Sequence, residues 1–210
     1  MWSWASISSV PAESKGEGDS VKKLLVIASI LCCASGTEDA AERIIRAEVI
    51  LDAPLSEVWK AWTTEEGARK FFAPDCRIDL RVDGAYEMYF NPGAEPGRRG
   101  GEGLRILLLE PMRRLSFTWN APPENPYVRN QRTVVVIEYQ PLGPRRTHLR
   151  LTHSGWGVGP EWDAAYEYFN RAWKGTVLPR LQYSLTEAPV NWDNPPPLRP
   201  VIDTVRVEPT

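Results

Sequence analysis

His153 is the residue of this sequence best suited to acid–base chemistry. It closes a predicted strand over residues 147–153, where the two-residue period puts it on the same face as Leu149 and Leu151. Imidazole gains and loses protons near neutral pH, so in an apolar pocket it could anchor a polar group or move a proton. The position equally suits a core histidine that is satisfied by a backbone carbonyl or a neighbouring side chain. Both interpretations are open.

Four carboxylates could work with His153 on a carbonyl substrate, namely Glu87, Glu138, Asp163 and Glu167. Most carboxylates of this kind are solvated surface charges. The sequence has no nucleophile elbow and no phosphate-binding glycine loop before a helix. Its two histidines and three cysteines, of which Cys32 and Cys33 are adjacent, do not have the spacing of a metal site. We therefore expect no metal and no cofactor.

An unusually aromatic stripe follows His153. Trp162, Ala165, Tyr166, Phe169, Trp173, Val177 and Leu181 recur at steps of three and four. This period predicts one long amphipathic helix with a single buried face. Aromatic rings are rigid and bulky, so such a face either fills a core or lines a cavity for an apolar ligand.

The residues that we expect to contact a ligand come from this helix and from the strands that would face it. They are Tyr86, Met88, Phe90, Trp119, His153, Trp156, Trp162, Tyr166, Phe169 and Trp173. The facing of residues 85–90 is open, because Ala85, Glu87 and Tyr89 alternate almost as well as Tyr86, Met88 and Phe90.

The elements before His153 are short strands with helices only near the start. Residues 43–51 form a predicted strand, a helix begins at Pro54, and Thr64 caps a second short helix that ends before Pro74. Alternation predicts a strand over 76–82, and Asp83-Gly84 favours a hairpin turn into 85–90. Further strands are expected over 103–110, 115–119, 133–139 and 147–153, with loops over 91–101 and 121–130. This order predicts an α+β domain, an antiparallel sheet with helices on one face.

Length and charge limit the function classes. The chain has 210 residues, enough for one domain with a substantial core, and a formal charge of -2 with a pI near 5.8. A nucleic-acid-binding domain usually carries a basic excess, so we expect no nucleic-acid partner.

Both ends of the chain differ from its centre. In residues 1–40, Lys22-Lys23, an apolar run over 24–33 and the small residues 34–36 have the order of a secretory signal. A start at Val21, read as an initiator, would make that signal compact. Use of the signal at 21–36 predicts an exported protein, and otherwise the protein is cytoplasmic. Residues 41–185 form the expected domain, and the proline-rich residues 186–210 an extended tail, pinned at Trp192 or by a short strand over 201–207.

Several motifs together resemble a known superfamily. They are Ala53-Pro54 with Val58-Trp59, Arg81-Val82-Asp83-Gly84-Ala85-Tyr86, residues 107–111, residues 115–119, Leu151-Thr152-His153-Ser154-Gly155-Trp156 and the terminal helix. Over residues 43–185 the chain resembles the helix-grip superfamily of START domains and polyketide cyclases (SRPBCC). Within it the chain is similar to the branch named after the activator homologue of the heat-shock-protein-90 ATPase. The resemblance implies about seven antiparallel strands curved around a long C-terminal helix, with two short helices after the first strand.

The resemblance also implies a function, since this superfamily often binds hydrophobic small molecules between sheet and helix. We expect such binding without established catalysis. One alternative is a cyclase- or hydrolase-like enzyme that acts on an apolar substrate through His153, and another is a protein-interaction or co-chaperone-like module. Association with the chaperone is not expected of an exported protein, because it would not meet a cytosolic partner.

Overall fold

The computed structural model describes residues 43–200. The predicted leader and the predicted strand over 201–207 lie outside these residues. No helix within the described part has the length and apolar character needed to cross a membrane.

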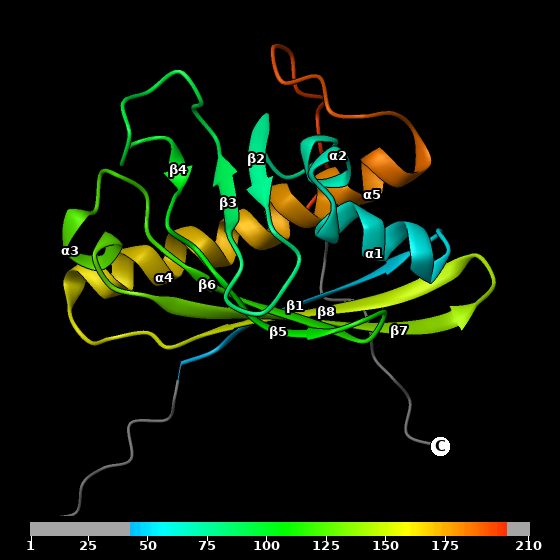
Figure 1. Cartoon of the computed structure of the whole chain (residues 1–210), viewed down its shortest axis with the longest axis horizontal. Helices are drawn as coiled ribbons and strands as arrows, with labels where there is room; N and C mark the ends of the chain where they lie inside the picture. The colour runs from blue at the N-terminus through cyan, green and yellow to red at the C-terminus, as the bar shows by residue number, and fades with distance from the viewer. Residues whose placement is uncertain (1–42, 201–210) are drawn as a thin grey trace, which may run out of the picture. The chain divides into compact units, whose positions relative to one another are not determined.

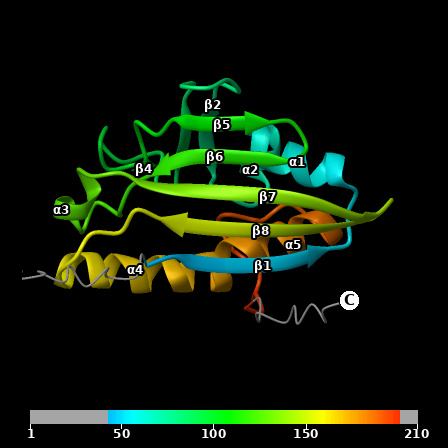
Figure 2. The same ribbon diagram turned by 90° about the horizontal axis from the view of Figure 1, so that it is seen from below.

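Eight strands in the described part form two antiparallel sheets. The larger sheet has the order β1-β8-β7-β6-β5 (Figure 2), and the smaller one the order β2-β3-β4 (Figure 1). Their bounds are β1 Ile45–Leu51, β2 Asp75–Ile78, β3 Tyr86–Tyr89, β4 Gly100–Gly101, β5 Ile106–Glu110, β6 Arg114–Trp119, β7 Thr133–Gly143 and β8 Arg146–Ser154. The antiparallel arrangement is confirmed, with eight strands where about seven were predicted.

The two sheets meet where β3 approaches the start of β5. Ala85 and Arg105 form an isolated antiparallel bridge. The Tyr86 amide donates to the Leu104 carbonyl at 2.9 Å, and the Ile106 amide donates to the Gly84 carbonyl at 3.0 Å. The smaller sheet therefore continues the hydrogen bonding of the larger one at one corner only.

The predicted hairpin is present, but its first strand is shorter than expected. β2 pairs with β3 in the register Ile78 to Tyr86, so β2 ends at Ile78 and not at Val82. Beyond it, Leu80 and Val82 are 41% and 59% exposed. The chain turns back where Asp83 has a φ of 62°, and a Cβ on Gly84 would lie 2.0 Å from the Asp79 carbonyl oxygen. This turn needs glycine, and its seven-residue loop takes Leu80 and Val82 out of the pleat.

Two short helices follow β1, as predicted, and a long helical segment closes the domain. The helices are α1 Leu55–Thr63, α2 Glu65–Arg69, α3 Pro126–Arg129, α4 Pro160–Ala172, a π-helical turn η1 Trp173–Val177, and α5 Leu178–Thr186. Thr64 caps α2, because its hydroxyl accepts from the Gly67 amide at 3.0 Å. α3 lies within residues 121–130, which were predicted to be a loop.

The π turn interrupts what the periodicity predicts as one uniform helix. The Leu178 amide bonds to the Trp173 carbonyl, five residues back. Pro179 has no N–H to donate to the Gly175 carbonyl, which would be its α-helical partner. Proline at the start of α5 thus coincides with the wider turn, and such turns are frequent at functional sites.

All helices and the smaller sheet lie on one face of the five-stranded sheet (Figure 1). The core between them holds inward-facing strand residues such as Leu149 and Ile137 together with Trp62, Phe72 and Trp173, each at most 1% exposed. The opposite face is polar. There Glu138 pairs with Arg114 at 3.1 Å and with Arg150 at 3.3 Å. These pairs place charged side chains on the outer face of the sheet.

The tail after α5 packs back on the domain. The Val190 amide donates to the Lys70 carbonyl, and Trp192 Nε1 donates to the Arg69 carbonyl, both at 2.8 Å. The Trp192 ring also lies under the Arg180 guanidinium, 5.1 Å from its centroid. Residues 187–200 contain no helix or strand, and Trp192 holds them at the end of α2.

Candidate functional site

A cavity of about 500 Å³ opens beside the C-terminal helical segment. Its walls are residues 90–101 after β3, residues 119–124 after β6, Arg129 of α3, and the face of α4, η1 and α5 between residues 168 and 180. Phe72, just after α2, also lines it. We call this cavity the pocket. Its volume falls within the range of small-molecule sites, roughly 300 to 1,000 Å³.

Aromatic rings form much of the pocket wall, namely Phe72, Phe90, Trp119, Tyr168, Phe169 and Trp173. Phe72 stacks on Trp119 with a centroid separation of 5.5 Å, and Trp119 lies 5.7 Å from Trp173. The rings support one another on the core side, so their positions are fixed by packing. Phe90 is 46% exposed and lies at the mouth.

The helical period places most pocket-lining residues of α4, η1 and α5 on one face of the helical segment. Phe169, Ala172, Trp173, Thr176, Val177 and Arg180 line the pocket. Successive members of this set are three residues or one residue apart, which keeps them on a single face across the π turn, and Tyr168 and Arg171 also line the pocket. Part of the buried helical face that the sequence predicts therefore packs in the core, and part of it lines the pocket.

Arg129 holds the two loops of the pocket together. Its guanidinium donates to the carbonyls of Gly97 and Gly100, to the carbonyl of Ala121, and to the Glu102 carboxylate. The bonds from the Nη atoms to the carbonyls are 2.7 to 2.8 Å long, Nε also donates to the Gly97 carbonyl at 3.1 Å, and the carboxylate lies at 3.3 Å. Burial lowers the pKa of Arg129, and Glu102 acts against that shift. One side chain thus fixes the loop at 97–100 against the strand end at Ala121.

Arginines dominate the polar part of the wall. Arg98, Arg99, Arg171 and Arg180 join Arg129 there, against the single carboxylate of Glu124. Asn120 is 7% exposed, and its side chain makes no hydrogen bond within residues 43–200. The pocket therefore combines an aromatic body with a cationic, hydrogen-bonding rim.

His153 is buried beside the pocket but does not line it. Trp173 Nε1 donates to His153 Nδ1 at 3.0 Å, and His153 Nε2 lies 2.7 Å from Thr133 Oγ1. Indole N–H can only donate, so Nδ1 accepts and the proton resides on Nε2, which donates to Thr133. Burial lowers the pKa of His153 to about 3. The ring is neutral, both of its nitrogens are occupied, and it supports Trp173 from behind.

The other predicted contact residues divide into two groups. Phe90, Trp119, Phe169 and Trp173 line the pocket. Tyr86, Met88, Trp156, Trp162 and Tyr166 lie elsewhere. Tyr86 and Met88 face inward and are fully buried, which settles the facing of β3, and the Tyr86 hydroxyl donates to the Trp62 carbonyl at 2.8 Å.

The three remaining aromatic residues pack at the start of the long helix. Trp162 belongs to a second small core with Ala121 and Val128. Trp156 donates to the His153 carbonyl at 2.9 Å, and Tyr166 lies under the Arg43 guanidinium. These contacts give each of the three side chains a packing role outside the pocket.

The carboxylates considered for acid–base chemistry also lie outside the pocket. Glu138 belongs to the outer face of the sheet, Asp163 pairs with Arg43, and Glu167 is exposed. Glu87 accepts from the Tyr89 hydroxyl and from the Gly103 amide. None of the four meets His153 across a cavity. Within residues 43–200 there is also no group of three or more His, Cys, Asp or Glu that could hold a metal ion.

Sequence reasoning missed the polar residues of the pocket. Arg98, Arg99 and Arg129 lie in the segments 91–101 and 121–130, which the sequence predicts only to be loops. Arg180 could have been noticed, because it follows Trp173 by seven residues and so returns to the same helical face. Asn120 and Arg129 carry no local signal, since only the folded chain brings their loops together.

The fold and the pocket define a helix-grip protein, in which an antiparallel sheet packs against a long C-terminal helix beside a cavity. The family model of the activator of Hsp90 ATPase homolog 1-like proteins matches residues 52–178, and the chain belongs to this family. Comparison with curated proteins gives no match.

Solved structures share the fold at low sequence identity. Protein MLL2253 from Mesorhizobium loti is 24% identical, with a TM-score of 0.53, over 67% of this chain and 94% of that one. The Aha1 dimer from Colwellia psychrerythraea is 20% identical, with a TM-score of 0.54, over 70% and 98%. CalU16 from Micromonospora echinospora is 23% identical, with a TM-score of 0.52, over 70% and 78%.

Proposed function

We propose that this protein binds a small molecule with an apolar, partly aromatic body in the pocket. The observation that carries the proposal is a cavity of about 500 Å³ lined by six aromatic side chains. Aromatic wall residues offer large contact areas and lose little conformational freedom when a ligand binds.

Binding without turnover is favoured over catalysis by the position of the titratable groups. His153 has both nitrogens occupied and is separated from the pocket by the Trp173 ring. Glu124 is the one carboxylate in the wall, and it lies close enough to Arg129 to influence the pKa of that residue. The pocket wall therefore presents rings and cations, and no histidine beside an acid.

The proposal is tested by filling the pocket. Ala172 lines it and Ala164 is exposed on the same helix, so Ala172→Phe and Ala164→Phe are a matched pair. The neutral fluorophore N-phenyl-1-naphthylamine is titrated into both variants and into the parent protein. We expect the parent and Ala164→Phe to enhance its fluorescence saturably, and Ala172→Phe to lose at least tenfold in affinity, since the added ring occupies the space of the probe.

Folding of both variants is checked by circular dichroism and by thermal melting. Equal binding by Ala172→Phe and Ala164→Phe would place the probe elsewhere. A parent protein that binds neither this fluorophore nor any of a broad set of neutral and ionic apolar compounds would contradict the proposal.

A further inference from the structure

The charge of the pocket wall differs from that of the chain. The chain carries 25 Lys and Arg against 27 Asp and Glu, a formal charge of -2. The pocket wall has five arginines and one glutamate. Such a concentration of one sign around an apolar cavity creates a local field that favours the opposite charge.

Only some of these arginine side chains form hydrogen bonds or ion pairs with other residues of the domain. Arg129 is bound by carbonyls and by Glu102, and Arg99 Nε donates to the Ala94 carbonyl at 3.1 Å. By contrast, the guanidinium groups of Arg98, Arg171 and Arg180 form no ion pair within residues 43–200. The guanidinium groups of these three rim arginines thus have neither an ion pair nor a hydrogen bond in this part of the chain.

Arg180 is the most confined of the three. The Trp192 ring covers one side of its guanidinium, and its Nε is shielded from solvent without a hydrogen-bond partner in the described part. Burial lowers its pKa, and no acid counteracts that shift. A buried cationic donor without an acceptor is costly, which makes Arg180 the natural receiving group for an anion.

A second donor in the wall is also unpartnered. The Trp119 ring lines the pocket, and its Nε1–H is buried without an acceptor among the described residues. Indole and guanidinium groups donate and do not accept. The complement of both groups is a ligand with acceptor oxygens, whereas a ligand cation would face five arginines and a single carboxylate.

We infer that the ligand is an amphipathic anion, with its apolar body against the aromatic wall and a carboxylate-like group held by Arg180 at the rim. This inference rests on the proposed function and adds the chemical class of the ligand. Arg98 and Arg171 contribute their charge from the two sides of the mouth. Trp192, although it belongs to the tail, orients Arg180 by covering the other face of its guanidinium.

The test compares three probes with one ring system, namely 2-naphthoate, 2-naphthalenemethanol and 2-naphthylmethylammonium, by calorimetry with the full chain. We expect naphthoate to bind at least tenfold more tightly than the alcohol, and the ammonium to bind most weakly, because charge-assisted hydrogen bonds are the stronger ones. Binding of the alcohol and naphthoate with equal affinity would leave the proposed function intact and overturn this inference. Binding of none of the three would count against the proposed function itself.

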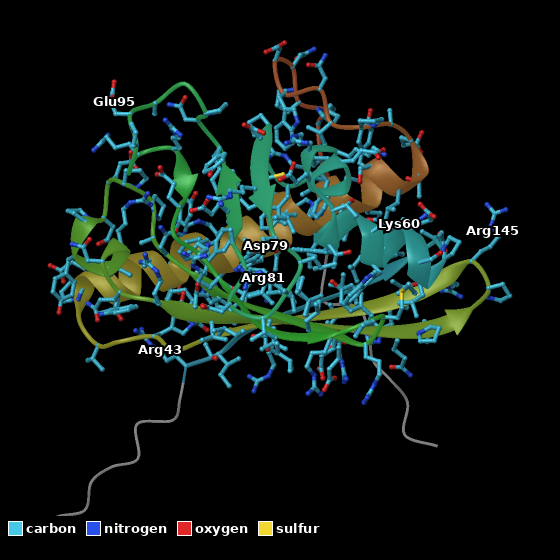
Figure 3. All side chains as sticks on the ribbon, viewed as in Figure 1. Arg43, Lys60, Asp79, Arg81, Glu95 and Arg145 are labelled. Carbon is cyan, nitrogen blue, oxygen red and sulfur yellow. The ribbon has the colours of Figure 1, made fainter. Side chains whose placement is uncertain are left out.

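The role of Arg180 is tested with Arg180→Met and with Arg145→Met as its control. Arg145 is exposed in the β7–β8 turn, at the opposite end of the view from Glu95 in the loop after β3, and it lies outside the pocket wall (Figure 3). Arg180→Met should weaken naphthoate about tenfold and the alcohol less than twofold, whereas Arg145→Met should change neither by twofold. An equal loss for both probes would show a merely structural role and contradict the assignment.

A second pair of variants covers the case in which Arg180→Met does not fold. Arg98→Met and Arg171→Met remove the exposed cations of the rim, and each should reduce the preference for naphthoate over the alcohol about threefold. An unchanged preference in both variants would overturn the inference, because the rim charge would then have no effect on the ligand.

Discussion

The burial of His153 predicts a specific acid sensitivity of the fold. In the folded protein its pKa is lowered to about 3, against an ordinary value of 6.5. Between these values the unfolded chain binds a proton that the folded chain does not, so the free energy of unfolding falls as the pH decreases from about 6.5. The contribution is fully present above that value and is progressively lost below it.

The magnitude follows from the two pKa values. Near pH 4.5 the unfolded chain is protonated at His153 and the folded chain is not. The free energy of unfolding is therefore lower by roughly 2 to 3 kcal/mol than at pH 7.5. The physical cause is visible in the contacts, because a proton on Nδ1 would face the Trp173 N–H and would have no solvent around it. That loss is a large part of an ordinary domain's stability.

The assay compares the parent with His153→Gln by urea unfolding at a series of pH values between 7.5 and 4.5. Other groups titrate in both proteins, so the difference between the two pH profiles isolates His153. Ile137→Val is the control, since it removes a buried methylene from the neighbouring strand without a titrating group and should shift the whole profile by about 1 kcal/mol without changing its slope. Parallel profiles for the parent and His153→Gln would refute the reasoning.

Two further predictions concern Arg129 and Cys76. Arg129→Met should increase amide hydrogen exchange in residues 97–102 about tenfold and leave exchange in β7 and β8 unchanged, because the Arg129 side chain binds the carbonyls of that loop. Equal exchange in the parent and the variant would contradict this role. Burial raises the pKa of the Cys76 thiol to about 11. In a chain with Cys32 and Cys33 changed to serine, the folded protein at pH 8 should therefore react with a thiol reagent on the order of a hundredfold more slowly than the protein unfolded in urea. A folded protein that reacts as fast as the unfolded one would disprove the burial of this group.

Much of the fold could be predicted because the signals are local and periodic. The β-branched run before Pro54, the Thr64 cap and the stripe from Trp162 to Leu181 each follow from residue types within one element. The end of β2 could not be found in this way. Cys76, Ile78, Leu80 and Val82 alternate correctly, yet the geometry of the turn at Asp83 and Gly84 removes the last two from the strand.

The candidate site was less predictable, because it is made of residues whose roles depend on distant partners. Aromatic residues on one helical face were identified, but their division between core and pocket depends on where the two loops lie. Arg129 fixes that position through carbonyl groups, which carry no side-chain signal in a sequence. His153 was predicted to face inward, and it does, but Thr133 and Trp173 occupy its nitrogens from elements 20 residues away on either side.

The concentration of arginines around the pocket also has a consequence at long range. Taking the five arginines and one glutamate of the wall from the chain's formal charge of -2 leaves -6 for the rest of the sequence. A positive mouth on an otherwise negative chain repels anions from most directions and attracts them to one. The association rate of an anionic ligand should therefore decrease steeply as ionic strength rises and the Debye length shortens below about 10 Å, while its dissociation rate should change little.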